Sequence, residues 1–149
     1  MKLCHNNGIF SDVLAVFIYI CLIRRIRRHV KKKTLVLGAS TNPERFSYMA
    51  VRKLKYGNIP VVAVGLREGE ISGVRIEKPF PKFEDIHTIT IYIGPKNLTA
   101  YYDYIIGLKP KRVIFNPGTE SPEFAGRLSS AGVEVVHACT LIMISNNLY

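Results

Sequence analysis

The sequence predicts a single α/β domain built on a mostly parallel sheet of five to six strands, with helices on both faces. Short apolar runs alternate with stretches of helical periodicity at the spacing of strand–helix–strand units. Most of these runs end at glycine or asparagine and lack polar alternation, which is typical of strands buried on both faces. The chain has 149 residues, 48% hydrophobic and 21% charged, which allows one folded domain and little more.

The first strand, first helix and second strand open the body of the domain. Thr34–Leu37 is a continuous apolar run, and the second such run covers residues 60–64. Between them, Pro43 is expected at the first helical position, and the helix is expected to end before Gly57. Apolar residues at helical spacing predict the buried face of this helix: Phe46, Ala50, Val51 and Leu54.

The rest of the body repeats this alternation without an internal repeat or a linker, so residues 34–149 are expected to form one domain. Residues 67–73 are rich in glycine and charge and are expected to be a loop. The further strands are expected at residues 74–80, 88–93, 112–115 and 133–136, and the further helices at 98–108 and 122–131.

The net charge of +10 belongs mainly to the start of the chain. Residues 1–33 hold eight lysines and arginines against one aspartate, whereas residues 34–149 hold 13 against 10 acidic residues. A groove that tracks the phosphates of a nucleic acid would need a strong basic patch on the folded body. We therefore expect no nucleic-acid partner.

Residues 1–33 are expected to form an N-terminal extension outside the domain. They hold an unbroken apolar run of 11 residues, 13–23, followed at once by an arginine-rich stretch. A membrane-spanning helix needs about 20 apolar residues, and a secretory signal would carry its positive charge before the run. Three interpretations remain: a short membrane anchor, a helix on an anionic membrane surface, or translated upstream sequence before a start near Val30. The body itself is expected in the cytoplasm.

The motifs of several common enzyme and metal-binding classes are missing. Three cysteines at wide spacings predict no disulfide framework. The patterns CxxC and HExxH are absent, so we expect no metal site. The patterns GxSxG and GxxxxGK[ST] are also absent, which removes the main sequence support for a serine hydrolase or a P-loop enzyme.

Ligands of parallel α/β sheets bind beyond the carboxyl ends of the strands, near the point where the strand order reverses. Backbone N–H groups of the first loop, and the start of the helix that follows it, would face an anion there. The full dinucleotide fingerprint is missing, because Ser40 and Pro43 stand where it needs glycine. The loops expected at this edge are Gly38–Ser40, Gly65–Arg67, Gly94–Pro95 and Asn116–Thr119.

The loop after the second strand favours a phosphate over a ribose diol. A domain that binds NAD is expected to place Asp or Glu there, whereas this chain has Leu66 and Arg67. Arginine is permanently charged and binds phosphates through its planar guanidinium. The loop therefore suits a ligand with an extra phosphate near its ribose, such as coenzyme A or NADP.

Four segments together resemble the small stand-alone CoA-binding proteins. Those proteins are single Rossmann-like domains similar to the CoA-binding domain of the succinyl-CoA synthetase α-subunit, and the resemblance covers about residues 31–149. The segments that carry it are Thr34–Ser47, Val62–Gly65, Arg112–Glu120 and Ala138–Met143.

The resemblance implies that coenzyme A is held over the strand ends. Its phosphates would lie near the first loop and Arg45, its adenosine ribose near Arg67, and Pro95 and Asn116 would line the wall. Leu66 departs from the proline or arginine that often fills its position. The residues implied to bind the cofactor are Gly38, Ala39, Ser40, Pro43, Arg45, Ser47, Gly65, Leu66, Arg67, Pro95 and Asn116.

The residues offer no complete catalytic set. The synthetase subunit uses a phosphorylated histidine of a second domain, and no second domain is expected in this chain. His87 and His137 flank strands and are expected to be structural or surface residues. Cys139 is expected to be a small buried apolar residue, although strand spacing would place it on one face with His137. Glu120 is the one carboxylate expected near the strand ends.

We therefore expect a non-enzymatic protein that senses or carries coenzyme A or acyl-CoA. Two alternatives from other classes stay open. One is an enzyme, either a small NADP-dependent reductase or a thiol enzyme that acts on acyl-CoA through Cys139. The other is an interaction module tethered to a membrane by residues 1–33. Three tyrosines of one predicted helix could stack an adenine, although at least one must lie in the core: Tyr101, Tyr102 and Tyr104.

Overall fold

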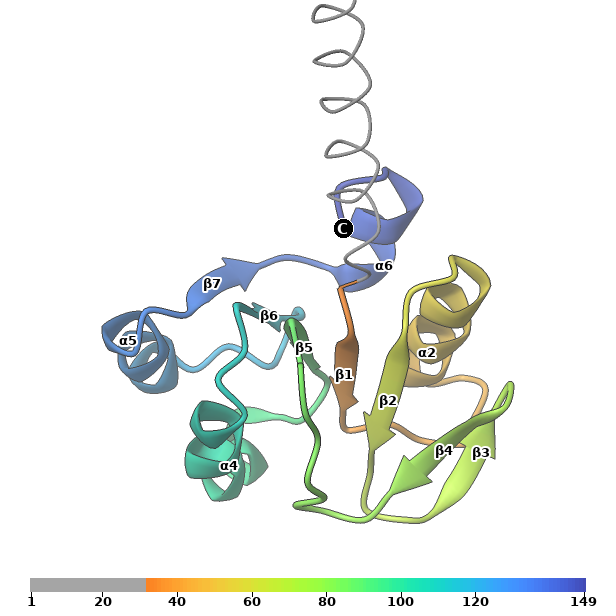
Figure 1. Ribbon diagram of the computed structural model, residues 1–149, viewed down its shortest axis with the longest axis horizontal. Coiled ribbons are helices and arrows are strands. Elements are labelled where there is room, and N and C mark those ends of the chain that lie inside the picture. The colour runs from red at the N-terminus through yellow and green to blue at the C-terminus, as the bar shows by residue number, and fades with distance from the viewer. Residues whose placement is uncertain (1–31) are drawn as a thin grey trace, which may run out of the picture. The chain divides into compact units, whose positions relative to one another are not determined.

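A computed structural model of the chain describes residues 32–149 (Figure 1). These residues form one compact unit around a seven-stranded sheet with the strand order β3-β4-β2-β1-β5-β6-β7. The strands are β1 (Thr34–Leu37), β2 (Val61–Val64), β3 (Gly69–Ile71), β4 (Val74–Glu77), β5 (Thr88–Ile91), β6 (Arg112–Phe115) and β7 (Glu134–His137). The helices are α2 (Phe46–Tyr56), α3 (Pro95–Leu98), the 3-10 turn η1 (Thr99–Tyr101), α4 (Tyr102–Gly107), α5 (Pro122–Ser130) and α6 (Thr140–Ser145).

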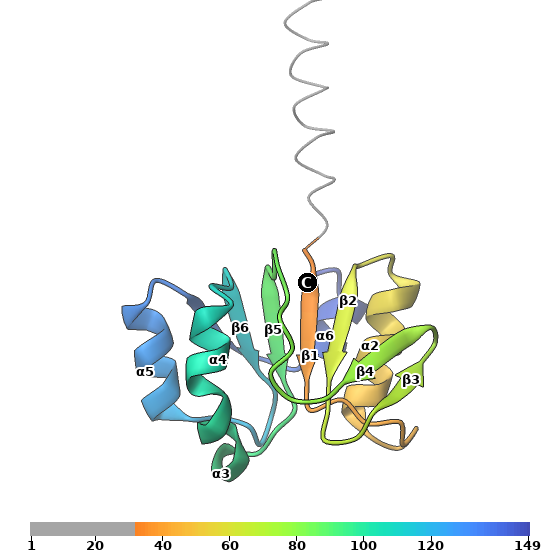
Figure 2. The ribbon, with the colours of Figure 1, turned by 60° about the horizontal axis from the view of Figure 1, so that its bottom comes forward.

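The strand order reverses at β1. The chain passes from β1 to β2 and β4 on one side, then returns to β5 on the other side and continues to β6 and β7. All of these strands are parallel, so their carboxyl ends meet at one edge, the lower edge in Figure 2. The predicted single α/β domain with a mostly parallel sheet is thus confirmed.

The sheet has one strand more than predicted, because the expected loop at residues 67–73 contains β3. This strand pairs antiparallel with β4, and Ser72 and Gly73 form the two-residue connection between them. Both connecting residues have positive φ, 50° and 80°, the backbone combination that closes a tight hairpin. The hairpin covers what would otherwise be the exposed edge of β4.

The start of the first helix also differs from the prediction. Helix α2 begins at Phe46, three residues after Pro43. Pro43 instead occupies the second position of a turn, which the bond from Arg45 N–H to the Asn42 carbonyl closes at 3.1 Å. Proline favours that turn position as strongly as a helix start, because both need the same φ.

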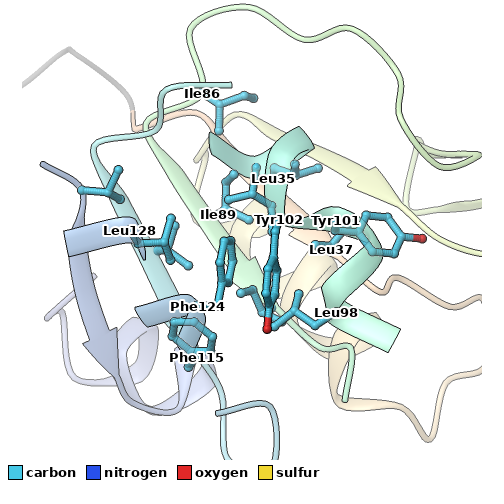
Figure 3. Close-up of a cluster of buried hydrophobic side chains, with 14 of the residues drawn as sticks. Leu35, Leu37, Ile86, Ile89, Leu98, Tyr101, Tyr102, Phe115, Phe124 and Leu128 are labelled. Carbon is cyan, nitrogen blue, oxygen red and sulfur yellow. The ribbon is translucent and has the colours of Figure 1, made fainter. Parts of the chain in front are cut away.

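The helices cover the two faces of the sheet and enclose one apolar cluster on each side. Helices α4 and α5 pack on the face that carries Leu35 and Leu37 (Figure 3). Helices α2 and α6 pack on the other face, which carries Val36. The rings of Tyr102 and Phe124 join α4 to α5, stacked with their centroids 4.0 Å apart. Leucine and isoleucine side chains from the parallel strands fill the remaining space.

The predicted extension falls almost wholly outside the described residues. The expectations of an anchor, a surface helix or an upstream translation product concern residues before Lys32 and are not addressed by the structure. In the part of the chain that the structure does describe, no helix is long and apolar enough to cross a membrane.

Candidate functional site

The loops after β1 and β2 lie against each other at the point where the strand order reverses. The N–H groups of Gly38 and Ala39 both donate to the carbonyl of Val64, at 2.9 and 2.8 Å. Gly65 follows directly, and a Cβ atom there would lie 2.3 Å from the Ala39 carbonyl oxygen. Because only glycine allows this approach, the predicted residues of the two loops form one continuous surface.

The loop from β1 to α2 is held in shape by its own polar side chains. Ser40 Oγ accepts a hydrogen bond from the Asn42 N–H at 3.2 Å, and Asn42 Oδ1 accepts one from the Glu44 N–H at 3.0 Å. Such turns are local and form without a ligand. The loop also rests on β3, where a Cβ on Gly69 would lie 2.4 Å from Cγ2 of Thr41. The loop is therefore preformed.

The start of α2 is open to an anion, whereas the start of α5 is closed. No side chain caps α2 at Arg45, and its first turn holds no acidic residue. In α5, Ser121 Oγ accepts the Phe124 N–H at 3.3 Å, and Glu123 lies in the first turn. The uncapped N–H groups and the helix dipole make the start of α2 favourable for a negative charge.

Arg67 has no acidic partner among residues 32–149, and the neighbouring Glu68 pairs with residues of the β4 strand and its end. Glu68 lies 3.7 Å from both Arg75 and Lys78, charged residues on and just after β4. Among residues 32–149, neither Arg67 nor Arg45 has a carboxylate within 4 Å, and both are exposed. Two cations therefore flank the first loop with no charge partner of their own in the described part of the chain.

Two exposed apolar side chains belong to this edge. Leu66, a predicted site residue, is 82% exposed. Phe46 was predicted to lie in the buried face of α2, and this is wrong, since it is 66% exposed while Ala50, Val51 and Leu54 are buried. Phe46 is the first residue of the helix. The sequence signal that could have found it is its place directly after the turn, beside Arg45.

The side chain of Asn116 is buried and hydrogen-bonded within the protein. Its side chain is 3% exposed, and its amide donates to Thr90 Oγ1 at 2.7 Å and to the Ile91 carbonyl at 2.9 Å. Its Oδ1 accepts the N–H of Thr140, the first residue of α6, at 2.8 Å. The Asn116 side chain thus ties β5, β6 and α6 together. Its prediction as a wall residue, like that of Pro95 on the exposed start of α3, stays a prediction.

The tyrosines that could have stacked an adenine are engaged in the core. Tyr101 and Tyr102 are 6% and 5% exposed, and the Tyr102 hydroxyl pairs with Ser121 Oγ at 2.8 Å. The Tyr104 hydroxyl donates to the Pro81 carbonyl at 2.8 Å. These three tyrosines therefore do not form a platform for a base at the strand ends.

The groups weighed as catalytic do not come together. His137 ends β7 and stacks on Phe115, with ring centroids 5.4 Å apart, whereas Cys139 lies past the strand at the start of α6. The expected common strand face of these two residues is wrong, because the strand ends at His137. Glu120 accepts the Gly118 N–H at 2.8 Å. Within residues 32–149, no three metal-binding side chains gather.

His87 lies at the opposite edge of the sheet, just before β5, and acidification is expected to destabilise the domain through it. Burial lowers the pKa of its imidazole below the usual 6.5, and the positive charges of Arg112, Lys32 and Lys111 lower this pKa further. The negative charge of Glu134 partly offsets the decrease. The folded chain therefore binds this proton less readily than the unfolded chain. The free energy of unfolding therefore keeps its full value above pH 6.5 and decreases as the pH falls through the lowered pKa of His87 in the folded chain.

Melting curves from about pH 8 down to about pH 5 test this expectation. His87→Gln should show a shallower loss of melting temperature with acidification than the parent chain, because it removes one group that takes up a proton on unfolding. Equal slopes for the two proteins would show that the acid sensitivity comes from other groups.

Comparison with known proteins places the chain among ligand-binding domains. A family model described as a CoA binding domain matches residues 32–145. The crystal structure of an uncharacterized protein is 44% identical with a TM-score of 0.78, over 81% of this chain and 100% of that chain. A Thermus thermophilus protein is 25% identical (TM-score 0.70, 85% and 98% covered), and a conserved hypothetical Pyrococcus furiosus protein is 26% identical (TM-score 0.65, 76% and 98% covered). No curated protein matches the chain.

Proposed function

Because the chain belongs to the CoA binding domain family, we propose that it binds coenzyme A over the carboxyl ends of β1, β2 and β5, as a non-catalytic sensor or carrier of CoA or acyl-CoA. The observation that carries this proposal is the start of α2. There a preformed loop leads into an uncapped helix whose first turn holds no acidic residue. A pyrophosphate is the part of CoA that matches such a group of N–H donors.

Arg45 and Arg67, which have no carboxylate partner in the described part of the chain, suit the two ends of the phosphate-bearing part of the ligand. Arg45 directly precedes α2 and would neutralise the pyrophosphate. Arg67 lies in the loop after β2, next to the position where an adenosine ribose would lie. There it would bind the 3′-phosphate. Since Glu68 is directed to Arg75 and Lys78, no carboxylate of this loop remains for a ribose diol, which favours CoA over NAD.

Backbone contacts and apolar contacts would complete the site. Gly38 and Gly65 let the loops after β1, β2 and β5 pack closely against one another at the strand ends, and Ser47 in the first turn of α2 is buried below the loop. Leu66 and Phe46 offer exposed apolar surface at the two sides of the loop, suited to the adenine or to the pantetheine. Burying such surface against a ligand is favourable in proportion to its area.

A non-catalytic role is supported by how the reactive groups are used. Glu120 holds its own turn, His137 stacks on Phe115, and His87 lies at the other edge of the sheet. General acid–base catalysis needs a proton-transferring group within hydrogen-bonding reach of a substrate. The groups near the strand ends supply phosphate binding rather than such a pair.

Ligand-dependent melting tests the proposal. CoA at about one hundred times its Kd should stabilise the domain by roughly 2.7 kcal/mol, or roughly 10 °C for a domain of this size, because it binds only the folded chain. NAD at the same concentration should have a much smaller effect, because its ribose diol finds no carboxylate. Greater stabilisation by NAD or NADP than by CoA would contradict the assignment.

A further inference from the structure

A row of polar side chains lies at the edge of the sheet opposite the proposed CoA site. Thr34, Thr88, Arg112 and Glu134 are the first residues of β1, β5, β6 and β7, and they are paired in register across the sheet. Val36, two residues after Thr34, packs on the α2 and α6 face. Because strand residues two apart share a face, the whole row projects onto that face. Figure 2 shows the end of the chain at this edge, beside the start of β1.

Arg112 is a buried cation with unused donors. Its side chain belongs to a residue only 7% exposed, and its Nε and Nη2 atoms have no hydrogen-bond partner in the described part of the chain. These two nitrogens form one edge of the guanidinium, the edge that binds two oxygens of a carboxylate or phosphate at once. Glu134 stands next to it in register, but no carboxylate of residues 32–149 lies within 4 Å.

Tyr149 covers Arg112, and its hydroxyl lies near the guanidinium without meeting the geometry of a hydrogen bond to Nε or Nη2. The guanidinium carbon lies over the Tyr149 ring, 4.9 Å from its centre. The Tyr149 hydroxyl pairs with Thr34 Oγ1 at 2.9 Å. Burial raises the pKa of this phenol, although Thr34 and the charge of Arg112 partly offset the rise, so the hydroxyl is neutral at ordinary pH. A ring below a guanidinium partly compensates its charge, but it is not an oxygen acceptor for the N–H groups.

The surroundings of Arg112 are positive. Burial and the charges of Arg112, Lys32 and Lys111 all lower the pKa of His87, and Glu134 alone opposes them. Lys32 Nζ donates to the main-chain oxygen of Tyr149 at 3.2 Å. The amino end of the sheet therefore combines a positive electrostatic field with two guanidinium N–H donors of Arg112 that no acceptor among the described residues satisfies.

We propose that the amino end of the sheet binds an oxyanion, a phosphate or carboxylate group whose two oxygens accept hydrogen bonds from Nε and Nη2 of Arg112. The hydroxyl of Thr88 lies in the same row and can donate to it, whereas the Thr34 hydroxyl donates to the Lys32 carbonyl. Both nitrogens are sealed from solvent in this conformation, so the Tyr149 ring is the cover that moves when the anion enters. The site is separate from the proposed CoA site, which lies at the other edge of the same strands.

Melting of the full chain in phosphate and in acetate, each against sodium chloride at equal ionic strength, tests the proposal. One or both anions should raise the melting temperature of the parent chain by a few degrees, and the stronger one identifies the anion as a phosphate or a carboxylate. Arg112→Gln should remove this rise, whereas Lys111→Gln, which removes an exposed charge nearby, should keep it. If Arg112→Gln does not fold, Arg112→Lys replaces it in the test. This variant keeps the charge but lacks the two parallel donors, so it should bind the anion about tenfold more weakly.

Four results would overturn the proposal. The first is no anion-specific rise in the parent chain. The second is a rise that survives Arg112→Gln but disappears in Arg45→Ala, because the anion then binds at the start of α2. The third is that Glu134→Gln loses as much stability as Arg112→Gln while the parent chain shows no response to either anion. The fourth is the same result for Tyr149→Phe. Glu134 or the Tyr149 hydroxyl would then be the acceptor of Arg112 in solution.

Discussion

Gly65→Ala is expected to destabilise the domain and to weaken CoA binding together. The new Cβ would lie 2.3 Å from the Ala39 carbonyl oxygen and 2.9 Å from Cγ2 of Ile76, distances that ordinary contacts do not reach. The Ala39 carbonyl cannot give way by itself, because the Gly38 and Ala39 N–H groups are both bonded to Val64. The first loop must move as a whole, at a cost of about 1–3 kcal/mol for overpacking.

Binding should suffer beyond this loss of stability. The same loop leads into the start of α2, so moving it misplaces the N–H groups that would hold the pyrophosphate. We expect CoA affinity to fall at least about tenfold, since each charge-assisted hydrogen bond contributes roughly 1.5–3 kcal/mol. Urea unfolding measures the stability, and calorimetric titration of the folded variant with CoA measures the affinity.

Gly126→Ala is the matched control. Gly126 lies inside α5, where an added Cβ meets nothing within 4 Å. The same chemical change should therefore stabilise the domain by about 0.5–1 kcal/mol, because alanine loses less backbone freedom in a helix than glycine does. It should leave CoA affinity unchanged. A Gly65→Ala protein as stable as the parent chain, with the same CoA affinity, would show that the contact between the two loops is not required.

The parallel sheet could be predicted because its strands are buried on both faces. Such strands are continuous apolar runs, and β1, β2, β5 and β6 stand out as runs between glycine, proline and asparagine. β3 could not be predicted in this way, since it is three residues long and contains a glycine and a glutamate. What forms it is the Ser72–Gly73 turn, a pair that equally suits an open loop.

Helix α6 was not predicted, for a related reason. Its six residues hold one short apolar run, which does not distinguish a helix from a strand. Its first N–H group is bonded to the side chain of Asn116, 24 residues earlier in the chain. A cap that comes from another element leaves no local signal, so only the tertiary structure reveals it.

The position of the candidate site could be predicted, but the directions of its side chains could not. The rule that ligands bind at the carboxyl ends of parallel strands is sufficient to select the loops after β1 and β2. The directions of Glu68 and Asn116 depend on partners that are distant in sequence. Glu68 turns toward Arg75 of β4, and Asn116 turns inward to the carbonyl of Ile91. Phe46 fits the helical period of a core residue, yet it precedes the part of α2 that the sheet covers.

Arg67→Ala is expected to weaken CoA binding on the order of tenfold to a hundredfold, because a hydrogen bond to a charged group contributes roughly 1.5–3 kcal/mol. Arg67 is exposed and has no carboxylate within 4 Å among the described residues, so its removal should not alter folding. If its partner is the 3′-phosphate, the variant should bind dephospho-CoA, which lacks that group, as well as the parent chain does.

Arg45→Ala provides the contrast that isolates the pairing. Arg45 precedes the open start of α2 and is proposed to neutralise the pyrophosphate, which CoA and dephospho-CoA share, so this variant should bind both ligands more weakly by the same factor. Calorimetric titration of each variant with each ligand completes the cycle, and a general loss of folding would lower both affinities together. Equal losses of CoA and dephospho-CoA affinity in Arg67→Ala would remove Arg67 from the 3′-phosphate. The proposed discrimination between CoA and NAD would then depend on the direction of Glu68 alone, away from the ligand and toward Arg75.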